Sequence, residues 1–76
     1  LRPDYIKIDM ELIRGVHADA YKALIAEKII EIARSLNIET IAEGIETPEE
    51  LAWIQAHGAD YAQGYLIAKP SEPVFR

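Results

Sequence analysis

The sequence predicts an α/β fold in which strands and helices alternate in the order strand, helix, strand, helix, strand. Two observations predict it. Three short apolar runs rich in β-branched and aromatic residues alternate with two stretches of helical periodicity. The connections between successive runs are long enough for right-handed crossovers, so all three strands can lie parallel.

The first strand is predicted over residues 3–9, behind a proline. Alternation places Ile6 and Ile8 on one face of the sheet. The opposite face then carries Tyr5, Lys7 and Asp9. Residues 10–19 form a connector, with a helical turn around residues 10–13 that ends before Gly15.

A long helix is predicted over residues 18–36, because apolar side chains recur there at three- and four-residue spacing. Asn37 suits the left-handed conformation that ends many helices. We expect the recurring side chains to form the apolar face of this helix: Tyr21, Leu24, Ile25, Ile29, Ile32, Ala33 and Leu36.

The second strand is predicted over residues 38–43, with Ile41 and Glu43 on one face. A helix then opens at Thr47, where Thr47 can cap it, Pro48 fits the first turn and Glu50 completes a capping box. Gly58 closes this helix. The third strand is predicted over residues 60–67, with one face formed by Tyr61, Gln63 and Tyr65.

The composition narrows the possible functions. The chain has 76 residues, 50% of them hydrophobic, and a net charge of −5. An acidic chain without a basic run is poorly suited to duplex nucleic acid. It has no cysteine and therefore no disulfide. No apolar run approaches the ~18 residues that a membrane span needs.

Polar residues close each apolar run: Lys7 and Asp9, then Glu43, then Gln63. Each has an ordinary interpretation. Lys7 and Asp9 can form a strand-end ion pair, Glu43 can be a solvated loop carboxylate, and Gln63 can mark a turn. Glu46 can simply assist the cap of the following helix. Their joint placement at the carboxyl ends of successive parallel strands favours a functional site instead.

Three segments resemble the last third of an EAL domain, the family of bacterial cyclic di-GMP phosphodiesterases. They are residues 7–9 (Lys-Ile-Asp), residues 42–47 (Ala-Glu-Gly-Ile-Glu-Thr) and residues 58–65 (Gly-Ala-Asp-Tyr-Ala-Gln-Gly-Tyr), followed by Lys69-Pro70. The resemblance implies that residues 1–76 are a partial EAL-like domain. They would form the last three strands and intervening helices of a (β/α)8 barrel of the TIM type.

The resemblance also implies a metal-dependent phosphodiesterase that hydrolyses cyclic di-GMP to linear pGpG at a two-metal site holding Mg²⁺ or Mn²⁺. It assigns Lys7 to the attacking water or the phosphate, and Glu43 to metal binding and candidate general-base catalysis. It places Asp9 in the polar network of the metals, with Glu43. Glu46 would brace the neighbouring loop, and Gln63 would support the site.

The resemblance implies that most metal ligands of an EAL domain lie in the first two thirds of its barrel. This sequence lacks those segments: the Glu-Ala-Leu signature, a metal-binding Asn, a second strand that carries a glutamate, and an Asp-Asp-Phe-Gly segment. We therefore expect the isolated chain to be inactive. Three hypotheses remain open. The chain is a fragment of an active phosphodiesterase, a non-catalytic EAL-like module that binds a nucleotide or a protein, or a structural or engineered partial barrel. The sequence begins at Leu1, close to the first strand, which favours a piece of something longer.

The resemblance implies a location in the bacterial cytoplasm, with a parent that can be membrane-anchored or multidomain although the chain itself has no membrane segment. Three parallel strands alone leave two open edges and an uncovered face. We therefore expect either missing barrel segments or self-association to cover them.

Overall fold

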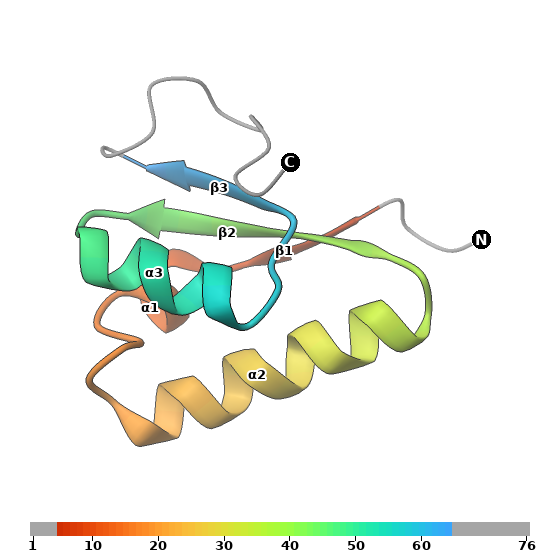
Figure 1. Ribbon diagram of the computed structural model, residues 1–76, viewed down its shortest axis with the longest axis horizontal. Helices are drawn as coiled ribbons and strands as arrows, with labels where there is room; N and C mark the ends of the chain where they lie inside the picture. The colour runs from red at the N-terminus through yellow and green to blue at the C-terminus, as the bar shows by residue number, and fades with distance from the viewer. Residues whose placement is uncertain (1–4, 65–76) are drawn as a thin grey trace.

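The computed structural model describes residues 5–64 and follows the predicted order of elements (Figure 1). The three strands form one parallel sheet in the order β1-β2-β3. This confirms the α/β fold expected from the sequence. The elements are β1 (Tyr5–Ile8), α1 (Met10–Ile13), α2 (Ala20–Ser35), β2 (Glu39–Ile45), α3 (Pro48–Ala56) and β3 (Tyr61–Gly64).

The molecule has two layers, with α2 and α3 on the same side of the sheet (Figure 1). The core lies between the layers and consists of buried residues from all three strands, from α1, α2 and α3, and from the turn before β3. In β1, Ile8 is buried while Tyr5 and Lys7 are exposed, which confirms the predicted alternation. The core residues are Ile8, Ile13, Ile30, Ala42, Ile45, Ile54, Ala59 and Ala62.

The predicted helix ends are confirmed. The hydroxyl of Thr47 accepts a hydrogen bond from the Glu50 amide at 3.1 Å, and the Glu50 carboxylate accepts one from the Thr47 amide at 3.2 Å. This is the capping box, with Pro48 in the first turn of α3. Asn37 follows α2 with φ 59°, in the left-handed region that ends a helix.

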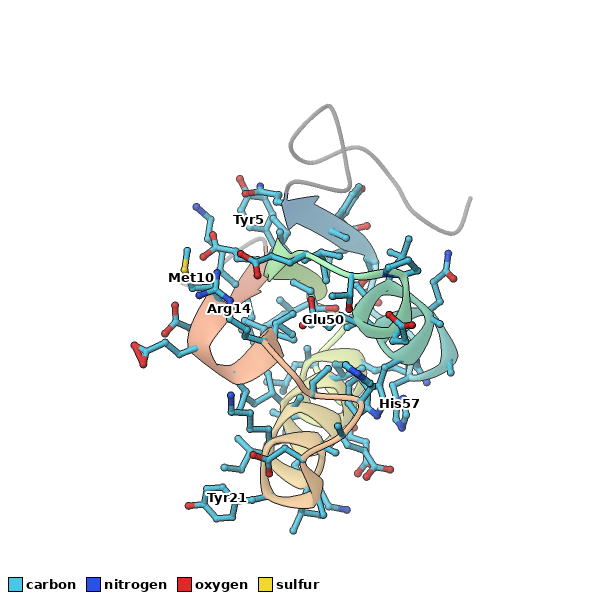
Figure 2. The ribbon with its side chains drawn as sticks, turned by 90° about the vertical axis from the view of Figure 1, so that its left-hand side faces the viewer. Tyr5, Met10, Arg14, Tyr21, Glu50 and His57 are labelled. Atoms are coloured by element: carbon cyan, nitrogen blue, oxygen red, sulfur yellow. The ribbon has the colours of Figure 1, made fainter. Side chains whose placement is uncertain are left out.

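The predicted apolar face of α2 is wrong for most of its residues: only Ala33 is buried as expected, and Ile29 packs partly buried against the core. The buried residues of α2 are Ala26, Ile30 and Ala33, whose two alanines let the helix approach the sheet closely. Most of the larger side chains that we assigned to the core lie on the outer face, and Figure 2 shows Tyr21 pointing away from the molecule. The exposed ones are Tyr21, Leu24, Ile25, Ile32 and Leu36.

Several strand boundaries also differ from the prediction. β1 ends at Ile8, one residue before Asp9, and β3 begins at Tyr61, one residue later than predicted. β2 begins one residue later and continues beyond Glu43 through Gly44 to Ile45, with a register shift against β3 between Ala42 and Ile45. Gly44 permits this continuation because its φ of 80° is accessible to glycine. β3 is described only to Gly64, so the predicted contribution of Tyr65 lies outside the described residues. No helix within residues 5–64 has the length and apolar character to cross a membrane.

Candidate active site at the carboxyl ends of the strands

The strand register places three of the predicted site residues side by side. Ile8 pairs with Ala42, and Ala42 pairs with Ala62. Asp9, Glu43 and Gln63 are the next residues after these three aligned positions. The sheet therefore brings two carboxylates, Asp9 and Glu43, and the amide of Gln63 to one end, as the sequence predicts. Figure 2 looks onto this end, toward which β2 and β3 point.

Lys7 forms an ion pair with Glu43, with 3.8 Å between Nζ and Oε2. The side chains are 59% and 27% exposed, so water screens the pair and it contributes little to stability. Among the described residues Lys7 therefore pairs with the neighbouring strand, and the ordinary alternative of a Lys7–Asp9 ion pair does not form. The pair joins a cation and a carboxylate across β1 and β2.

An open hollow of about 540 Å³ lies at this end of the sheet, and we call it the carboxyl-end hollow. Three predicted site residues line it together: Glu43, Glu46 and Gln63. Asp9 lies beside it rather than in its lining: it is exposed at the N-cap of α1, and its side chain makes no capping hydrogen bond. The other lining residues are Met10, Arg14, Gly44 and Gly64.

Glu46 is held by a residue that the sequence did not single out. Its Oε2 lies 2.8 Å from Nη2 of Arg14, which follows α1. The Arg14 carbonyl oxygen in turn accepts a hydrogen bond from Nζ of Lys22 at 2.7 Å. The Arg14–Glu46 pair is thus a contact between the β1–α2 connector and the β2–α3 loop.

Glu50 is a buried carboxylate at the junction of these loops, only 3% exposed. Its Oε1 accepts hydrogen bonds from the amides of Glu46 at 2.8 Å and Thr47 at 3.2 Å. Its Oε2 accepts one from the amide of Gly15 at 2.8 Å. The sequence predicted the capping role of Glu50, but it gave no sign of the bond to Gly15. Figure 2 shows Glu50 in the interior, between α1 and α3.

The pKa of Glu50 reflects opposing causes. Burial raises the pKa of its carboxyl, but the backbone donors of Glu46, Gly15 and Thr47, together with the charge of His17, outweigh burial and leave the pKa below its ordinary value. Glu50 therefore stays ionised at neutral pH, and a charged acceptor makes stronger hydrogen bonds than a neutral one.

Gly44 marks a close approach of α1 to β2. A Cβ on Gly44 would overlap the Cβ of Met10, the first residue of α1. The helix after β1 thus packs directly on the residue that follows Glu43. An isolated glycine inside a strand is the one sequence signal that could have indicated this contact.

The carboxylates at this end offer the oxygen ligands that Mg²⁺ and Mn²⁺ prefer. Glu43 fits such a role, because its carboxylate is partly exposed at the carboxyl-end hollow. Within residues 5–64, however, no three His, Cys, Asp or Glu side chains are grouped closely enough to hold a metal ion. The described part of the chain can therefore supply only some of the ligands of a metal site.

Comparison with known proteins agrees with this geometry. The family model described as EAL domain matches residues 1–70. The chain is 41% identical over 70 residues to the probable cyclic di-GMP phosphodiesterase PdeD of Escherichia coli K12, covering 92% of this chain and 13% of PdeD. It is 43% identical over 68 residues to the blue light- and temperature-regulated antirepressor BluF of the same strain, covering 90% of this chain and 17% of BluF. The chain thus spans a small part of the curated relatives it matches.

Solved structures give the same result for the fold. A standalone versatile EAL protein from Vibrio cholerae O395, in its c-di-GMP-bound form, superposes with a TM-score of 0.86 at 37% identity, covering 100% of this chain and 32% of that protein. Klebsiella pneumoniae BlrP1, in a manganese and cyclic di-GMP complex at pH 6, gives a TM-score of 0.85 at 36% identity, covering 100% of this chain and 21% of BlrP1. The parallel sheet is part of a TIM-type barrel, and the chain belongs to the EAL domain family.

Proposed function

We propose that this chain is the last part of a cyclic di-GMP phosphodiesterase domain, residues 1–76 forming its final three strands and the helices between them. One observation carries the proposal. Lys7 lies 3.8 Å from Glu43 at the carboxyl ends of neighbouring parallel strands, and Glu43 faces a hollow shared with Glu46 and Gln63. Similar proteins include PdeD and PdeR, both named cyclic di-GMP phosphodiesterases, the former as probable.

The roles follow from the chemistry of each group. Lys7 is the cation that faces the phosphate or the attacking water, and Glu43 is a metal ligand or general base. Asp9 belongs to the metal network, at the end of the neighbouring strand. Glu46 and Gln63 are supporting residues that keep this network oriented. All these assignments are proposals for the complete domain.

The proposed cofactor is a pair of Mg²⁺ or Mn²⁺ ions. Its support is the oxygen donors at the carboxyl-end hollow and the manganese and calcium complexes of the similar BlrP1. Bound divalent ions would supply charge stabilisation and an activated water. This chain would contribute Glu43 and Asp9, with the remaining ligands from the rest of the barrel.

The proposal predicts that the 76-residue chain alone does not hydrolyse cyclic di-GMP, whereas a complete EAL domain containing these residues does. Both proteins are incubated with cyclic di-GMP and excess MgCl₂ or MnCl₂, and linear pGpG is measured by chromatography. Turnover by the short chain above a buffer control would contradict the expected inactivity. A complete domain that makes no pGpG with either metal would contradict the enzyme assignment.

The similarity to BluF favours a second candidate function. BluF is named as an antirepressor rather than as a phosphodiesterase, yet it is 43% identical to this chain. A non-catalytic domain would bind cyclic di-GMP or a protein without turnover. Equilibrium binding of cyclic di-GMP to the complete domain, measured by calorimetry in calcium, separates the two functions. Binding without hydrolysis in magnesium or manganese identifies the non-catalytic module.

The proposed small-molecule partner is cyclic di-GMP, and the proposed structural partners are the missing barrel segments or further copies of the chain. The exposed apolar side chains on α2 support the need for such partners. Sedimentation of the 76-residue chain should show self-association or a poorly folded monomer. A stable, cooperatively folding monomer at micromolar concentration would contradict this. The bacterial cytoplasmic location stays a prediction.

A further inference from the structure

The two loops that flank the candidate active site are joined by three contacts. The first loop is the β1–α2 connector, residues 9–19, which includes α1. The second is the β2–α3 loop, residues 46–47, taken here with the flanking residues of β2 and α3 from 44 to 50. The contacts are the Arg14–Glu46 ion pair, the hydrogen bond from Gly15 to Glu50, and the packing of Met10 on Gly44. We call the three contacts together the loop junction.

Glu50 divides its two oxygens between the loops. Oε1 accepts from the amides of Glu46 and Thr47 in the second loop, and Oε2 accepts from the amide of Gly15 in the first. Because Glu50 is 3% exposed, water cannot easily replace any of these bonds. A Gln side chain would keep an acceptor oxygen toward only one of the two loops and would turn its NH₂ group, a donor, toward the amides of the other.

Arg14 fixes the exposed side of the same junction. Its guanidinium is 2.8 Å from Glu46, and its carbonyl oxygen is anchored by Lys22. Arg14 also lines the carboxyl-end hollow together with Glu43. Arg14 is therefore in contact both with Glu46 and with the hollow that Glu43 lines.

Met10 completes the coupling on the Glu43 side. It packs on Gly44 so closely that no Cβ fits between them. Two residues earlier, Ile8 is paired in register with Ala42. Glu43 thus lies between a strand position fixed by register and a glycine fixed by α1, and its place depends on both loops.

We propose that Arg14 and Glu50 are positioning residues that make the β1–α2 connector and the β2–α3 loop one rigid body, and so hold Glu43 beside Lys7. Neither needs to touch the substrate. Both act through Glu46 and through the backbone on each side of it. The inference rests on the proposed function, because the group being positioned is the Glu43 of a phosphodiesterase site.

The first test uses a complete EAL domain that contains these residues. Arg14→Ala and Glu50→Gln should each lower kcat for cyclic di-GMP roughly 10- to 100-fold, with KM changed little, because misplacing a reacting group weakens the transition state more than binding. Arg14→Lys should recover part of the loss, because it keeps the charge facing Glu46. Lys28→Ala is the matched control, since it breaks the exposed Lys28–Glu31 pair (3.4 Å) on the outer side of α2.

The second test is hydrogen exchange of individual amides and does not depend on activity. Arg14→Ala alters the first loop, yet it should speed exchange at Glu46 and Thr47 in the second. Glu50→Gln alters the α3 side of the junction, yet it should speed exchange at Gly15 in the first loop, since one amide oxygen cannot replace both Oε1 and Oε2. Lys28→Ala should leave all these amides unchanged.

The outcomes separate the two proposals. If the unaltered domain makes no pGpG, the proposed function fails, and exchange alone decides the positioning inference. Faster exchange confined to the loop that carries each substitution overturns the coupling. Unchanged kcat in both Arg14→Ala and Glu50→Gln, in an active domain, overturns the positioning role. A loss of kcat that merely follows a lowered melting temperature, with no recovery by Arg14→Lys, also overturns it.

Discussion

The two ends of the sheet use acidic side chains in different ways. At the amino end, Asp60 and Thr40 exchange hydrogen bonds: Asp60 Oδ2 accepts from the Thr40 amide at 2.9 Å, and Thr40 Oγ1 accepts from the Asp60 amide at 3.3 Å. At the carboxyl end, Glu50 binds three amides of two loops, while Lys7 and Glu43 stay partly exposed.

The hollows at the two ends differ in the same way. The one at the amino end is about 220 Å³, and Arg34 beside it donates to the carbonyl oxygen of Gly58 at 3.4 Å. The carboxyl-end hollow is about 540 Å³ and is bordered by three charged side chains: Arg14 of the β1–α2 connector, Glu43 of β2 and Glu46 of the β2–α3 loop. The amino end thus joins neighbouring strands, and the carboxyl end gathers partly exposed charged side chains. In TIM-type barrels the carboxyl ends of the strands carry the active site, and the amino ends serve stability.

The largest expected effect tests whether chemistry is confined to the carboxyl end. In a complete domain, Glu43→Gln should lower turnover of cyclic di-GMP on the order of 10²-fold or more, and Lys7→Ala should do the same, because each removes a preorganised charged group. Arg34→Gln, which alters the amino end, should leave turnover unchanged. Initial rates of pGpG formation measure all three, and equal losses at both ends would break the comparison.

The next effect compares two glycines, one at each end. Gly44 and Gly58 both have positive φ, 80° and 88°, so alanine at either position costs about 1–2 kcal/mol in backbone strain. At Gly58 the new Cβ meets the end of the flexible Arg34 side chain, which can move. At Gly44 it meets Cβ of Met10 and lies 3.1 Å from its Cα, which cannot move alone.

Gly44→Ala should therefore lower the free energy of unfolding by roughly 1–3 kcal/mol more than Gly58→Ala, the usual cost of overpacking. Urea denaturation of the two variants in a complete domain measures the difference. Equal destabilisation would show that α1 adapts as easily as a surface arginine, and the carboxyl end would then be less rigid than the contacts indicate.

A smaller effect follows from the charge of Glu50. Its pKa is lower in the folded state than the ordinary value of 4.5, so its contribution to stability is complete above about 4.5 and is lost as the pH falls through the folded pKa. Glu50→Gln should cost about 1–2 kcal/mol at pH 7 and should remove this pH-dependent part. Unfolding free energies of both proteins between pH 7 and pH 3 test the sign; curves that stay parallel throughout would contradict it.

The smallest effect concerns stability at the candidate site itself. Because the Lys7–Glu43 pair is exposed and 3.8 Å long, Lys7→Ala should change the free energy of unfolding by less than about 1 kcal/mol. Thermal unfolding measures it. A larger loss would mean that the pair has a structural role, like that of Asp60 and Thr40, and that the two ends differ less than proposed.

Much of the fold could be predicted from the sequence because its signals are local. The capping box of Thr47 and Glu50, the left-handed Asn37 and the alternation in β1 each depend on a few neighbouring residues. The outer face of α2 could not be predicted, because periodicity shows that a helix has an apolar stripe but not what covers it. Here Ala26, Ile30 and Ala33 are the buried residues of α2, while most of its other large apolar side chains are exposed.

The candidate site could be predicted only in part, for a related reason. Parallel strands bring their ends together, so Asp9, Glu43 and Gln63 were expected at one edge of the sheet. Arg14 and the bond from Gly15 to Glu50 were not expected, because they join loops that are distant in sequence and follow no period. A glycine inside a strand, such as Gly44, indicates that another segment approaches closely. The sequence does not show that this segment is α1, through Met10.

Because the Glu50 carboxylate binds amides of two loops, it limits how loops can be exchanged between related domains. Loops of barrel enzymes are often treated as separable modules that can be exchanged one at a time. Here a graft that replaces residues 9–19 without residues 44–50, or the reverse, would leave Glu50 or its amide donors without their counterparts. The two segments should therefore be transplanted, and should be inherited, as a single unit.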